Sequence, residues 1–503
     1  MPRHAPPSPA VSEPSGPARR HVVIGATAGA AVASAGLTPF ATPSASAATS
    51  TGFLHGVASG DPLPTAVVLW TRVTPSADAT PGSGKGARVR VDWEVGVDET
   101  FEEVVRSGHV MTGTERDHTV KVDATRLEPG TRYAYRFRSK GVTSPVGWTR
   151  TAPGATSTPE RLRLGVVSCS NWEAGHFAAY RHLAQHTDLD AVLHMGDYIY
   201  EYPPGEYAAR DEVVRVTEPR HEILSLADYR IRHGQYKTDR DLQRLHAAAP
   251  WITTWDDHES ANDAWSGGAE NHDPELEGPW RARAAAARRA YDEWMPIRLS
   301  GTAALGDGTT IYRELRFGTL ADLRMLDLRT HRSEQVSYAQ LGKVGDEDRT
   351  MTGAAQMTWL KSSLSDSSAT WKLVGNSVMI SPVTFVDVDT GRALHELGGL
   401  IPPEGIPYNV DQWDGYTADR REVIDHLGDH AIDNTLFITG DIHSAWACDV
   451  PHNVGTYPLS RSVAVEFVGS SVTSDNLDDI LRVAPRTVSL SVEGTIRAAN
   501  PHV

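Results

Sequence analysis

Short apolar runs of β-type residues alternate with longer amphipathic stretches from residue 162 onward. The runs cover residues 164–167, 191–193 and 435–438, with a weaker fourth run at 251–255. Residues 177–186 and the Ala/Arg-rich stretch 280–294, which stops near Pro296, have the spacing of helices. Strands that alternate with helices predict a layered sheet with helices on its faces, and therefore an α/β fold for this part of the chain.

Residues 53–153 have a different pattern, in which short β-rich runs are separated by Gly, Pro and Asp turns. The runs cover residues 67–72, 89–95 and 133–137. This spacing is typical of a small all-β sandwich of the fibronectin type III or immunoglobulin kind. The Thr-, Pro- and Ser-rich segment 151–160 predicts a linker. A chain of 503 residues is long enough for two domains, which we place at 49–155 and 160–503.

The first fifty residues have the pattern of an export signal. Arg19 and Arg20 precede an uncharged apolar stretch at 22–37, and Ala45-Ser46-Ala47 offers a small-residue cleavage site. The paired arginines favour the twin-arginine (Tat) export machinery as a partner, with a signal over residues 1–48. The apolar stretch is shorter than the ~20 residues of a membrane span, which disfavours the alternative of a stable membrane anchor. We therefore expect a protein that is secreted or associated with the cell wall.

The formal net charge of −16 bears on the kind of partner that the chain can bind. A general nucleic-acid-binding surface needs a basic stripe that displaces counterions, so none is expected here. The same charge does not exclude an anionic substrate, because bound multivalent cations invert the local field of an acidic cleft.

Four polar motifs stand at the ends of the four apolar runs. They are Ser168-Cys169-Ser170-Asn171, Gly196-Asp197-Tyr198-Ile199-Tyr200, Asp256-Asp257-His258-Glu259 and Gly440-Asp441-Ile442-His443. In open α/β sheets, ligands bind at the edge formed by the carboxyl ends of the strands. Buried carboxylates are costly unless they are paired or coordinate a metal. The motifs therefore predict a two-metal site that cleaves phosphate esters by a metal-activated hydroxide.

The donor types divide between two ions. Cys169, Tyr200, Asp197 and His443 would give a first ion sulfur, phenolate, carboxylate and imidazole ligands, a set that suits ferric iron. The second ion would bind the oxygens of Asp197, Asp257 and Asp441, a set that suits calcium, magnesium or manganese. Asp256 is the weaker of the two adjacent aspartates, because neighbours on an extended segment point to opposite sides.

Three further side chains are candidates with two readings each. His258 would protonate the leaving alkoxide or stabilise charge at phosphorus, and its alternative role is to orient Asp257. Asn171 and Asn262 would contact substrate or metal through their amide oxygens, or serve as turn residues.

The two cysteines, Cys169 and Cys448, could form a disulfide in an exported protein, as an alternative to metal binding by Cys169.

These motifs, in this order over the whole mature chain, resemble the PhoD-like alkaline phosphatase (alkaline phosphatase D) family of exported bacterial phosphoesterases. Further matches to that family are residues 53–62, Leu69-Trp70-Thr71-Arg72, Phe317-Gly318, Leu326-Asp327-Leu328-Arg329, Gln356, Trp359-Leu360 and residues 371–376. The resemblance implies an N-terminal β-domain followed by a calcineurin-like metallophosphoesterase domain of four layers, α/β/β/α. It also implies iron with one or two calcium ions, and hydrolysis of phosphate mono- and diesters.

Comparison with purple acid phosphatases, which the resemblance makes more distant relatives, gives the candidate residues their family roles. Cys169 takes the position of an aspartate, Asp197 is similar to the bridging carboxylate, and Tyr200 is similar to the iron-binding tyrosine. Asp257 stands in place of an asparagine and is followed by the similar catalytic imidazole of His258. Asp441 replaces a histidine, while His443 is retained. No match is evident for one further histidine on the second metal.

Two other functions stay open. One is a phospholipase D-like phosphodiesterase that acts on lipid headgroups, and the other is a non-catalytic extracytoplasmic protein that binds metal or phosphate. The long, turn-rich segments 203–220 and 397–416 are candidates for a lid over the site.

Overall fold

The computed structural model describes residues 51–207, 212–299, 310–385 and 406–503. The expected export signal at 1–48 and parts of both candidate lid segments lie outside the described residues. Among the described residues, no helix combines the length and the apolar character that crossing a membrane requires.

The N-terminal part forms eight strands, in agreement with the β-rich pattern of its sequence. They are β1 (Val57–Leu63), β2 (Ala66–Arg72), β3 (Val89–Gly96), β4 (Val104–Thr112), β5 (Thr119–Thr125), β6 (Arg132–Ser139), β7 (Val142–Thr143) and β8 (Gly147–Arg150). One sheet has the order β4-β3-β6-β7, with β8 paired to β6. Apolar side chains from this sheet and from β1, β2 and β5 pack into one core, including Val67, Leu69, Val91, Val120 and Tyr135. The all-β region therefore has the expected two-layer arrangement.

The second layer of this region continues into the sheet that follows it in the sequence. β1, β2 and β5 join β9 (Leu164–Val167), β10 (Ala191–His194) and β11 (Trp251–Thr253) in one sheet of order β5-β2-β1-β11-β10-β9. The junction is a parallel pairing of Gly60 with Trp251. A Cβ atom on Gly60 would lie 2.0 Å from the carbonyl oxygen of Pro296, so only glycine permits this approach. The two parts of the chain therefore share a backbone-bonded sheet.

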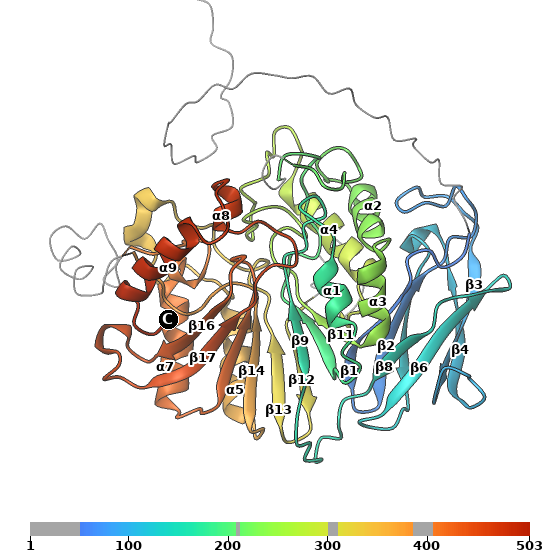
Figure 1. Ribbon diagram of the computed structural model, residues 1–503, viewed down its shortest axis with the longest axis horizontal. Coiled ribbons are helices and arrows are strands. Elements are labelled where there is room, and N and C mark those ends of the chain that lie inside the picture. Colours follow the sequence, from blue (N-terminus) through green and yellow to red (C-terminus); the bar gives the residue numbers. More distant parts are fainter. Residues whose placement is uncertain (1–50, 208–211, 300–309, 386–405) are drawn as a thin grey trace, which may run out of the picture. The chain divides into compact units, whose positions relative to one another are not determined.

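A second six-stranded sheet completes the α/β region. Its strands are β12 (Arg313–Phe317), β13 (Ala321–Met325), β14 (Trp371–Asn376), β15 (Thr435–Thr439), β17 (Ser462–Val468) and β16 (Trp446–Pro451), in this spatial order. Leu193 and Ile252 of the first sheet pack with Leu323, Met325 and Ile438 of the second, in a core between the two sheets. The sheets therefore face each other. Figure 1 labels β9 and β11 of the first sheet, and β12, β13, β14, β16 and β17 of the second.

Helices cover the outer faces of both sheets. On the first sheet lie α1 (Ala178–Leu183), α2 (Leu226–Tyr236), α3 (Arg240–Ala248) and α4 (Trp280–Trp294), which share a core with Val192 and Trp251. On the second sheet lie α5 (Ala354–Asp366) and α7 (Thr417–Asp429), packed on Val374 and Phe437. After the N-terminal β-domain, the layers are stacked in the order helix, sheet, sheet, helix (α/β/β/α). The expected fold class is therefore confirmed.

The strand directions bring the polar motifs to one edge. β9, β10 and β11 run parallel, and so do β13, β14, β15 and β17. The carboxyl ends of β9, β10 and β11 are followed directly by the motifs at 168–171, 196–200 and 256–259, and that of β15 by the motif at 440–443. The site therefore forms where the two facing sheets end together.

Candidate metal centre and active site

The backbone turns sharply after three of the four strands that are followed by predicted ligands, namely β9, β10 and β15. Cys169, Asp197, Asp441 and His443 have φ values of 59°, 57°, 67° and 55°. This left-handed region is uncommon for residues with a side chain, and it clusters at functional sites where the surrounding structure enforces it. The backbone adopts this unfavourable conformation at four candidate ligand positions. This indicates that the surrounding structure holds these residues in place for a function.

Two glycines let the strand ends approach each other closely. A Cβ on Gly196, whose φ is 108°, would lie 2.4 Å from Cβ of Asp256. A Cβ on Gly440 would lie 2.8 Å from Cβ of Ser168. Replacement of either glycine would therefore push apart the loops that carry Asp197 and Asp441.

The Glu259 carboxylate fixes the loop that carries Asp197. Its oxygens accept hydrogen bonds from the backbone N–H groups of Asp197 (3.1 Å), Tyr198 (2.6 Å) and Asp256 (2.9 Å). Burial raises the pKa of Glu259 to about 7, although these N–H groups act in the opposite direction. Glu259 thus has a structural task beside the candidate ligands.

Cys169, Asp197 and His443 come together at this edge. Each offers one ligand atom, and these atoms lie within 4.8 Å of one another. The Tyr200 hydroxyl donates to Asp197 Oδ2 at 3.1 Å and lies 2.6 Å from Ser474 Oγ. The four donors proposed for a first ion therefore surround one volume. Both Cys169 and Cys448 are free thiols, so the alternative of a disulfide between them is not realised.

His443 is prepared as a neutral ligand. Its Nδ1 lies 2.7 Å from the carbonyl oxygen of Asp475, to which it donates, and this leaves Nε2 as the free lone-pair nitrogen. Burial lowers the pKa of His443 to about 4. The imidazole is therefore uncharged at neutral pH and has the tautomer that coordination by Nε2 requires.

A second group consists of Asp197, Asp257 and His258, whose ligand atoms also lie within 4.8 Å of one another. Asp257 is held by the backbone N–H groups of His258 (2.9 Å) and Asp263 (2.7 Å). Asp197 belongs to both groups, as expected of a carboxylate that bridges two ions. Asp256 points away from them and forms two hydrogen bonds with Arg329, as its position on an extended segment predicts.

Asp441 stands somewhat apart from these groups. Its Oδ2 accepts from Nε2 of Gln412 at 3.1 Å, and its Oδ1 lies 3.7 Å from Nη2 of Arg329. No set of three ligand atoms among the described residues includes Asp441 within the spacing that joins the other candidates. Burial and Asp256 raise the pKa of Asp441 well above its ordinary value, whereas Arg329 lowers it.

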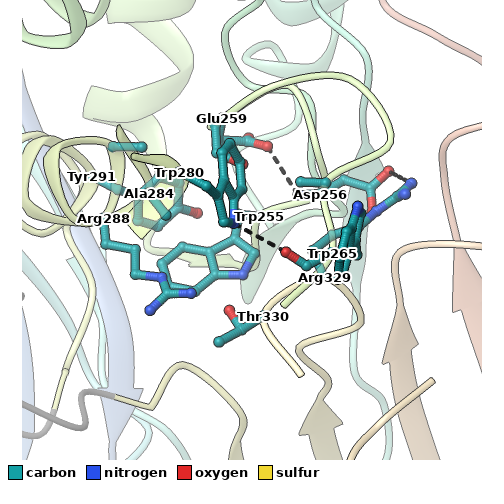
Figure 2. Close-up of a pocket in the computed structure, with 13 residues that line it drawn as sticks. Trp255, Asp256, Glu259, Trp265, Trp280, Ala284, Arg288, Tyr291, Arg329 and Thr330 are labelled. Carbon is teal, nitrogen blue, oxygen red and sulfur yellow. Dashed lines mark hydrogen bonds and ion pairs between the residues drawn. The ribbon is translucent and has the colours of Figure 1, made fainter. Parts of the chain in front are cut away.

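Arg329 is the main basic group of the site, and the sequence pattern gave it no role. It is buried, and its guanidinium contacts Asp256 at 2.6 Å and Asp411 at 2.9 Å. Figure 2 shows Asp256 between Arg329 and Glu259. Burial alone would raise the pKa of Asp411, but Arg329 and Arg332 lower it below its ordinary value. The signal was present in the sequence, because Arg329 ends the Leu326-Asp327-Leu328-Arg329 motif directly after β13.

Glu201 is a second residue that the sequence pattern did not identify. Its Oε2 lies 2.8 Å from Nδ1 of His258, and its Oε1 accepts from the N–H of Asn262 at 2.7 Å and from Nδ2 of Asn271 at 3.0 Å. Burial alone would lower the pKa of His258, but Asp257 and Glu201 raise it well above its ordinary value. Glu201 thus fixes the ring of His258 and stabilises its protonated form, as a carboxylate does in many His-dependent sites.

The two predicted substrate contacts have partners within the protein. The amide of Asn171 donates to the carbonyl of Tyr207 at 2.8 Å and accepts from the N–H of Glu173 at 2.9 Å. The side chain of Asn262 donates to Glu270 at 3.3 Å, and its backbone N–H donates to Glu201. Both asparagines therefore hold loops around the site in this state of the protein.

The residues of this edge fit metal ions, as a buried and unpaired oxygen shows. Oδ1 of Asp197 is buried and has no hydrogen-bond partner among the described residues, which is costly for a carboxylate. Burial raises the pKa of Asp197 well above its ordinary value, and burial together with Asp197 raises that of Cys169. A cation between these groups removes both penalties, because it pairs the oxygen and favours the ionised forms.

Two cavities adjoin the site. A small one of about 30 Å³ is lined by Trp255, Trp265, Trp280, Arg288 and Thr330, together with Asp256, Glu259 and Arg329 (Figure 2). A larger one of about 570 Å³ opens beside Asp441 and His443. The first has room for little more than water, whereas the second is of the size that binds small molecules.

Comparisons with known proteins agree with this architecture. Residues 39–153 match the model of the PhoD-like phosphatase N-terminal domain, and residues 164–503 match that of the PhoD-like phosphatase. The chain is 38% identical over 429 residues to alkaline phosphatase D of Bacillus subtilis (strain 168), with 84% of this chain and 69% of the relative covered. It is also similar to a solved structure of PhoD, with a TM-score of 0.79, 34% identity, and 92% and 83% of the two chains covered. The chain belongs to the PhoD-like phosphatase family, whose members are metal-dependent, and it is a phosphoric ester hydrolase.

Proposed function

We propose that this chain is an exported phosphoesterase of the alkaline phosphatase D type that hydrolyses phosphate mono- and diesters at a centre of ferric iron and calcium. One observation carries the proposal: Asp197 belongs to both ligand groups, and its Oδ1 is buried without a hydrogen-bond partner among the residues that the structure describes. A bridging carboxylate with a free oxygen is what a pair of cations requires.

The types of ligand atom in the two groups support a different ion for each. Cys169, Tyr200 and His443, with Asp197, supply sulfur, phenol oxygen and nitrogen, and such ligands suit ferric iron. Asp257 and Asp441, again with Asp197, supply oxygen alone, which suits one or two calcium ions. Asp263 and Asp411 lie within 4.8 Å of Asp257 and support this oxygen-rich side, although Arg329 and Arg332 already pair with Asp411.

The protein's own residues have distinct tasks in hydrolysis. When bound, the metal pair supplies the hydroxide nucleophile and positive charge for the phosphoryl oxygens. His258, protonated and held at Nδ1 by Glu201, donates a proton from Nε2 to the leaving oxygen. Arg329 pairs with Asp256 and Asp411, and its Nη2 also lies 3.7 Å from a carboxylate oxygen of both Asp257 and Asp441, so it offsets part of the negative charge around the proposed ligands. Asn171 and Asn262 are proposed to reach substrate only if they exchange their present partners.

The colour of the purified protein tests the iron assignment. Phenolate bound to ferric iron absorbs visible light, so we expect a violet protein that Tyr200→Phe bleaches. Tyr207→Phe is the matched control, because its ring stacks on that of Tyr200 at 5.4 Å while Tyr200 keeps its bond to Asp197. Colour that survives in Tyr200→Phe would exclude the tyrosine as a ligand. Chelation of calcium is expected to abolish activity reversibly while iron stays bound.

The export proposal rests on Arg19 and Arg20 ahead of the apolar stretch 22–37. The twin-arginine machinery then carries the protein out of the cell, to the medium or the cell wall. Replacement of both arginines by lysine keeps the charge and is expected to leave the enzyme inside the cell. Secretion of this double variant at the level of the native chain would exclude that route. The measurement is the fraction of phosphodiesterase activity in the culture medium.

A further inference from the structure

The Tyr207 side chain packs against two residues of the candidate metal centre. Its ring centre lies 5.4 Å from that of Tyr200, in a stacked arrangement, and 5.4 Å from that of His258. The Tyr202 ring stacks on it at 4.9 Å, with an angle of 2° between the two planes. Three rings therefore hold Tyr207 beside a proposed iron ligand and the proposed general acid.

The backbone of Tyr207 is anchored as well. Its carbonyl oxygen accepts the 2.8 Å hydrogen bond from Nδ2 of Asn171, which lies two residues after the candidate ligand Cys169. Because Oδ1 of Asn171 accepts from the N–H of Glu173 at 2.9 Å, this carboxamide is fixed at both ends. The predicted substrate contact at position 171 thus holds Tyr207 in place.

The hydroxyl of Tyr207 forms no hydrogen bond with any residue that the structure describes. The hydroxyl of Tyr200, in contrast, already contacts Asp197 and Ser474. Burial raises the pKa of Tyr207 well above its ordinary value, and so do four nearby acidic groups, all of them candidate ligands: Asp197, Asp257, Cys169 and Asp441. The hydroxyl therefore lies close to the ligands and keeps the proton that a donor needs.

A phosphoryl group at this centre needs hydrogen-bond donors for the oxygens that the metals do not bind. The guanidinium of Arg329 is already paired with Asp256 and Asp411. The Nε2 proton of His258 is assigned to the leaving oxygen. The hydroxyl of Tyr207 is a further donor at the centre, and none of the described residues accepts from it.

We propose that Tyr207 is a substrate-binding residue, whose hydroxyl donates a hydrogen bond to a non-bridging oxygen of the phosphoryl group. The inference rests on the proposed function and adds a residue to it. Substrate and product share the non-bridging oxygens. The same hydrogen bond should therefore strengthen the binding of inorganic phosphate, whatever alcohol the substrate carries.

Tyr207→Phe tests the inference, because it removes the hydroxyl and keeps the ring. In the metal-loaded full chain, we expect the dissociation constant of inorganic phosphate to rise by about tenfold or more, as for a hydrogen bond to a charged group. Calorimetry measures this constant without turnover. The value of kcat/KM should fall by a similar factor for p-nitrophenyl and alkyl esters alike. The metal content and the melting temperature should stay native.

Tyr202→Phe is the matched control. It also removes a phenol hydroxyl from the stacked rings, but this hydroxyl has other neighbours. Burial, Glu201 and Tyr207 raise the pKa of Tyr202, and Asp197 is not among the groups that act most strongly on it. We therefore expect Tyr202→Phe to change neither the affinity for inorganic phosphate nor kcat/KM.

The other outcomes overturn the inference. Native affinity for inorganic phosphate in Tyr207→Phe would do so directly. An equal loss in Tyr202→Phe would do so because ring packing would then explain both results. Loss of bound metal in Tyr207→Phe would assign the hydroxyl to the metal site, and a loss of turnover confined to alkyl esters would place it at the leaving oxygen.

The native protein separates this inference from the proposed function. If the metal-loaded native chain neither binds inorganic phosphate nor hydrolyses the esters, the proposed function itself is wrong. If the native chain does both and Tyr207→Phe matches it, only the role of Tyr207 is wrong.

Discussion

Two buried clusters of ionisable side chains lie on either side of Tyr198, and they resolve the cost of burial in opposite ways. The first is the metal edge, which consists of Cys169, Asp197, Tyr200, Asp257, Asp441 and His443. The second is the basic cluster, which consists of His55, His194, His233, Lys237 and His246. The basic cluster is buried throughout, and so are Cys169, Asp197, Tyr200 and Asp257, whereas Asp441 and His443 are partly exposed. They differ in what surrounds them.

The basic cluster lies among aromatic rings. Nζ of Lys237 lies 3.0 Å from Nε2 of His246 and 4.5 Å from the centre of the Trp70 ring. His246 stacks on Trp251 at 3.9 Å. Burial lowers the pKa of Lys237 well below its ordinary value, and burial with Lys237 does the same for the histidines. The histidines are therefore neutral at neutral pH and act as part of the packing.

The metal edge instead brings several carboxylates together, and burial raises the pKa of Asp197 and of Asp441 well above the ordinary value. Arg329, backbone N–H groups and the protonated His258 balance part of the negative charge, and an unpaired oxygen of Asp197 remains. The comparison shows that burial of ionisable groups does not by itself mark a functional site. What distinguishes the metal edge is the left-handed backbone at strand ends and a charge that the protein leaves incompletely balanced.

Asp197→Asn gives the largest expected effect. Loss of the bridging carboxylate removes a ligand from both groups, so we expect at least about a thousandfold loss of kcat/KM and loss of bound metal. Burial raises the pKa of Asp197 in the folded, metal-free protein. The unfolded chain ionises this carboxylate at its ordinary pKa of about 3.9, so the metal-free fold loses stability as the pH rises above that value. At pH 8 the metal-free variant should therefore melt at a higher temperature than the metal-free native protein.

Asp419→Asn is the control for this prediction. Asp419 is also a buried aspartate, but its Oδ2 accepts hydrogen bonds from Thr350 Oγ1 (2.7 Å), Met351 N (2.8 Å) and Thr352 N (3.1 Å). Its replacement should lower the melting temperature and leave the metal content unchanged. Opposite signs for the two variants are expected in thermal melts and metal analysis. A metal-loaded Asp197→Asn protein would contradict the bridging role.

The layers of the fold were predictable because the sequence pattern is strong there. Residues 280–294 form α4 with the expected bounds, and the apolar runs at 164–167 and 435–438 became β9 and β15. The motifs at strand ends could be expected to meet, since parallel strands of a sheet end at one edge. The sharing of a sheet by β1 and β11 could not be foreseen, because a single pairing at Gly60 leaves no periodic signal.

The partners of the candidate residues were the part that sequence alone did not predict. Arg329 and Glu201 are buried ion-pair partners, and their meaning depends on which distant side chain each one faces. Arg283, in the Ala/Arg-rich helix α4, illustrates the same difficulty. It is buried and pairs with Glu222 at 2.7 Å and Glu277 at 3.0 Å. Helical spacing predicts which residues share a face, but not which of them find a buried partner.

Glu201→Gln has the next largest expected effect on activity, and it tests whether the metal edge stabilises a charged His258. Gln keeps the shape of Glu201 but removes the charge that stabilises protonated His258. If His258 protonates the leaving oxygen, we expect about 10–100-fold lower kcat for esters of alkyl alcohols, up to the lower end of the contribution of general acid catalysis, because Gln weakens the acid without removing it. Esters of p-nitrophenol need no such proton and should change by less than about threefold.

Glu173→Gln is the matched control for Glu201→Gln. Glu173 is buried in a neighbouring loop, where it accepts from the N–H of Gly205 at 3.0 Å. Its replacement should affect both classes of ester equally, because it makes no contact with His258. The measurement is kcat for a series of diesters with leaving groups of increasing pKa. An equal loss for all leaving groups in Glu201→Gln would assign Glu201 a structural role only.

His233→Phe tests the basic cluster and has the smallest expected effect. Neither ring nitrogen of His233 has a hydrogen-bond partner among the described residues, and the ring stacks near Tyr198 and Trp294. Burial and Lys237 lower the pKa of His233 to about 3. The unfolded chain takes up a proton at about pH 6.5 whereas the folded protein does not, so this histidine's contribution to stability is complete above pH 6.5 and is lost as the pH falls toward 3.

Phenylalanine fills the same space and does not titrate, so the variant should escape this loss. We expect a native-like free energy of unfolding at pH 8, and at pH 5 a gain of about 2 kcal/mol over the native protein. Urea unfolding at the two pH values measures the difference. His186→Gln, at an exposed position after α1, is the matched control. An equal change at pH 5 and pH 8 in His233→Phe would mean that His233 becomes protonated in the folded protein over the same pH range as in the unfolded chain. The basic cluster would then need a hidden counter-charge, and its contrast with the metal edge would disappear.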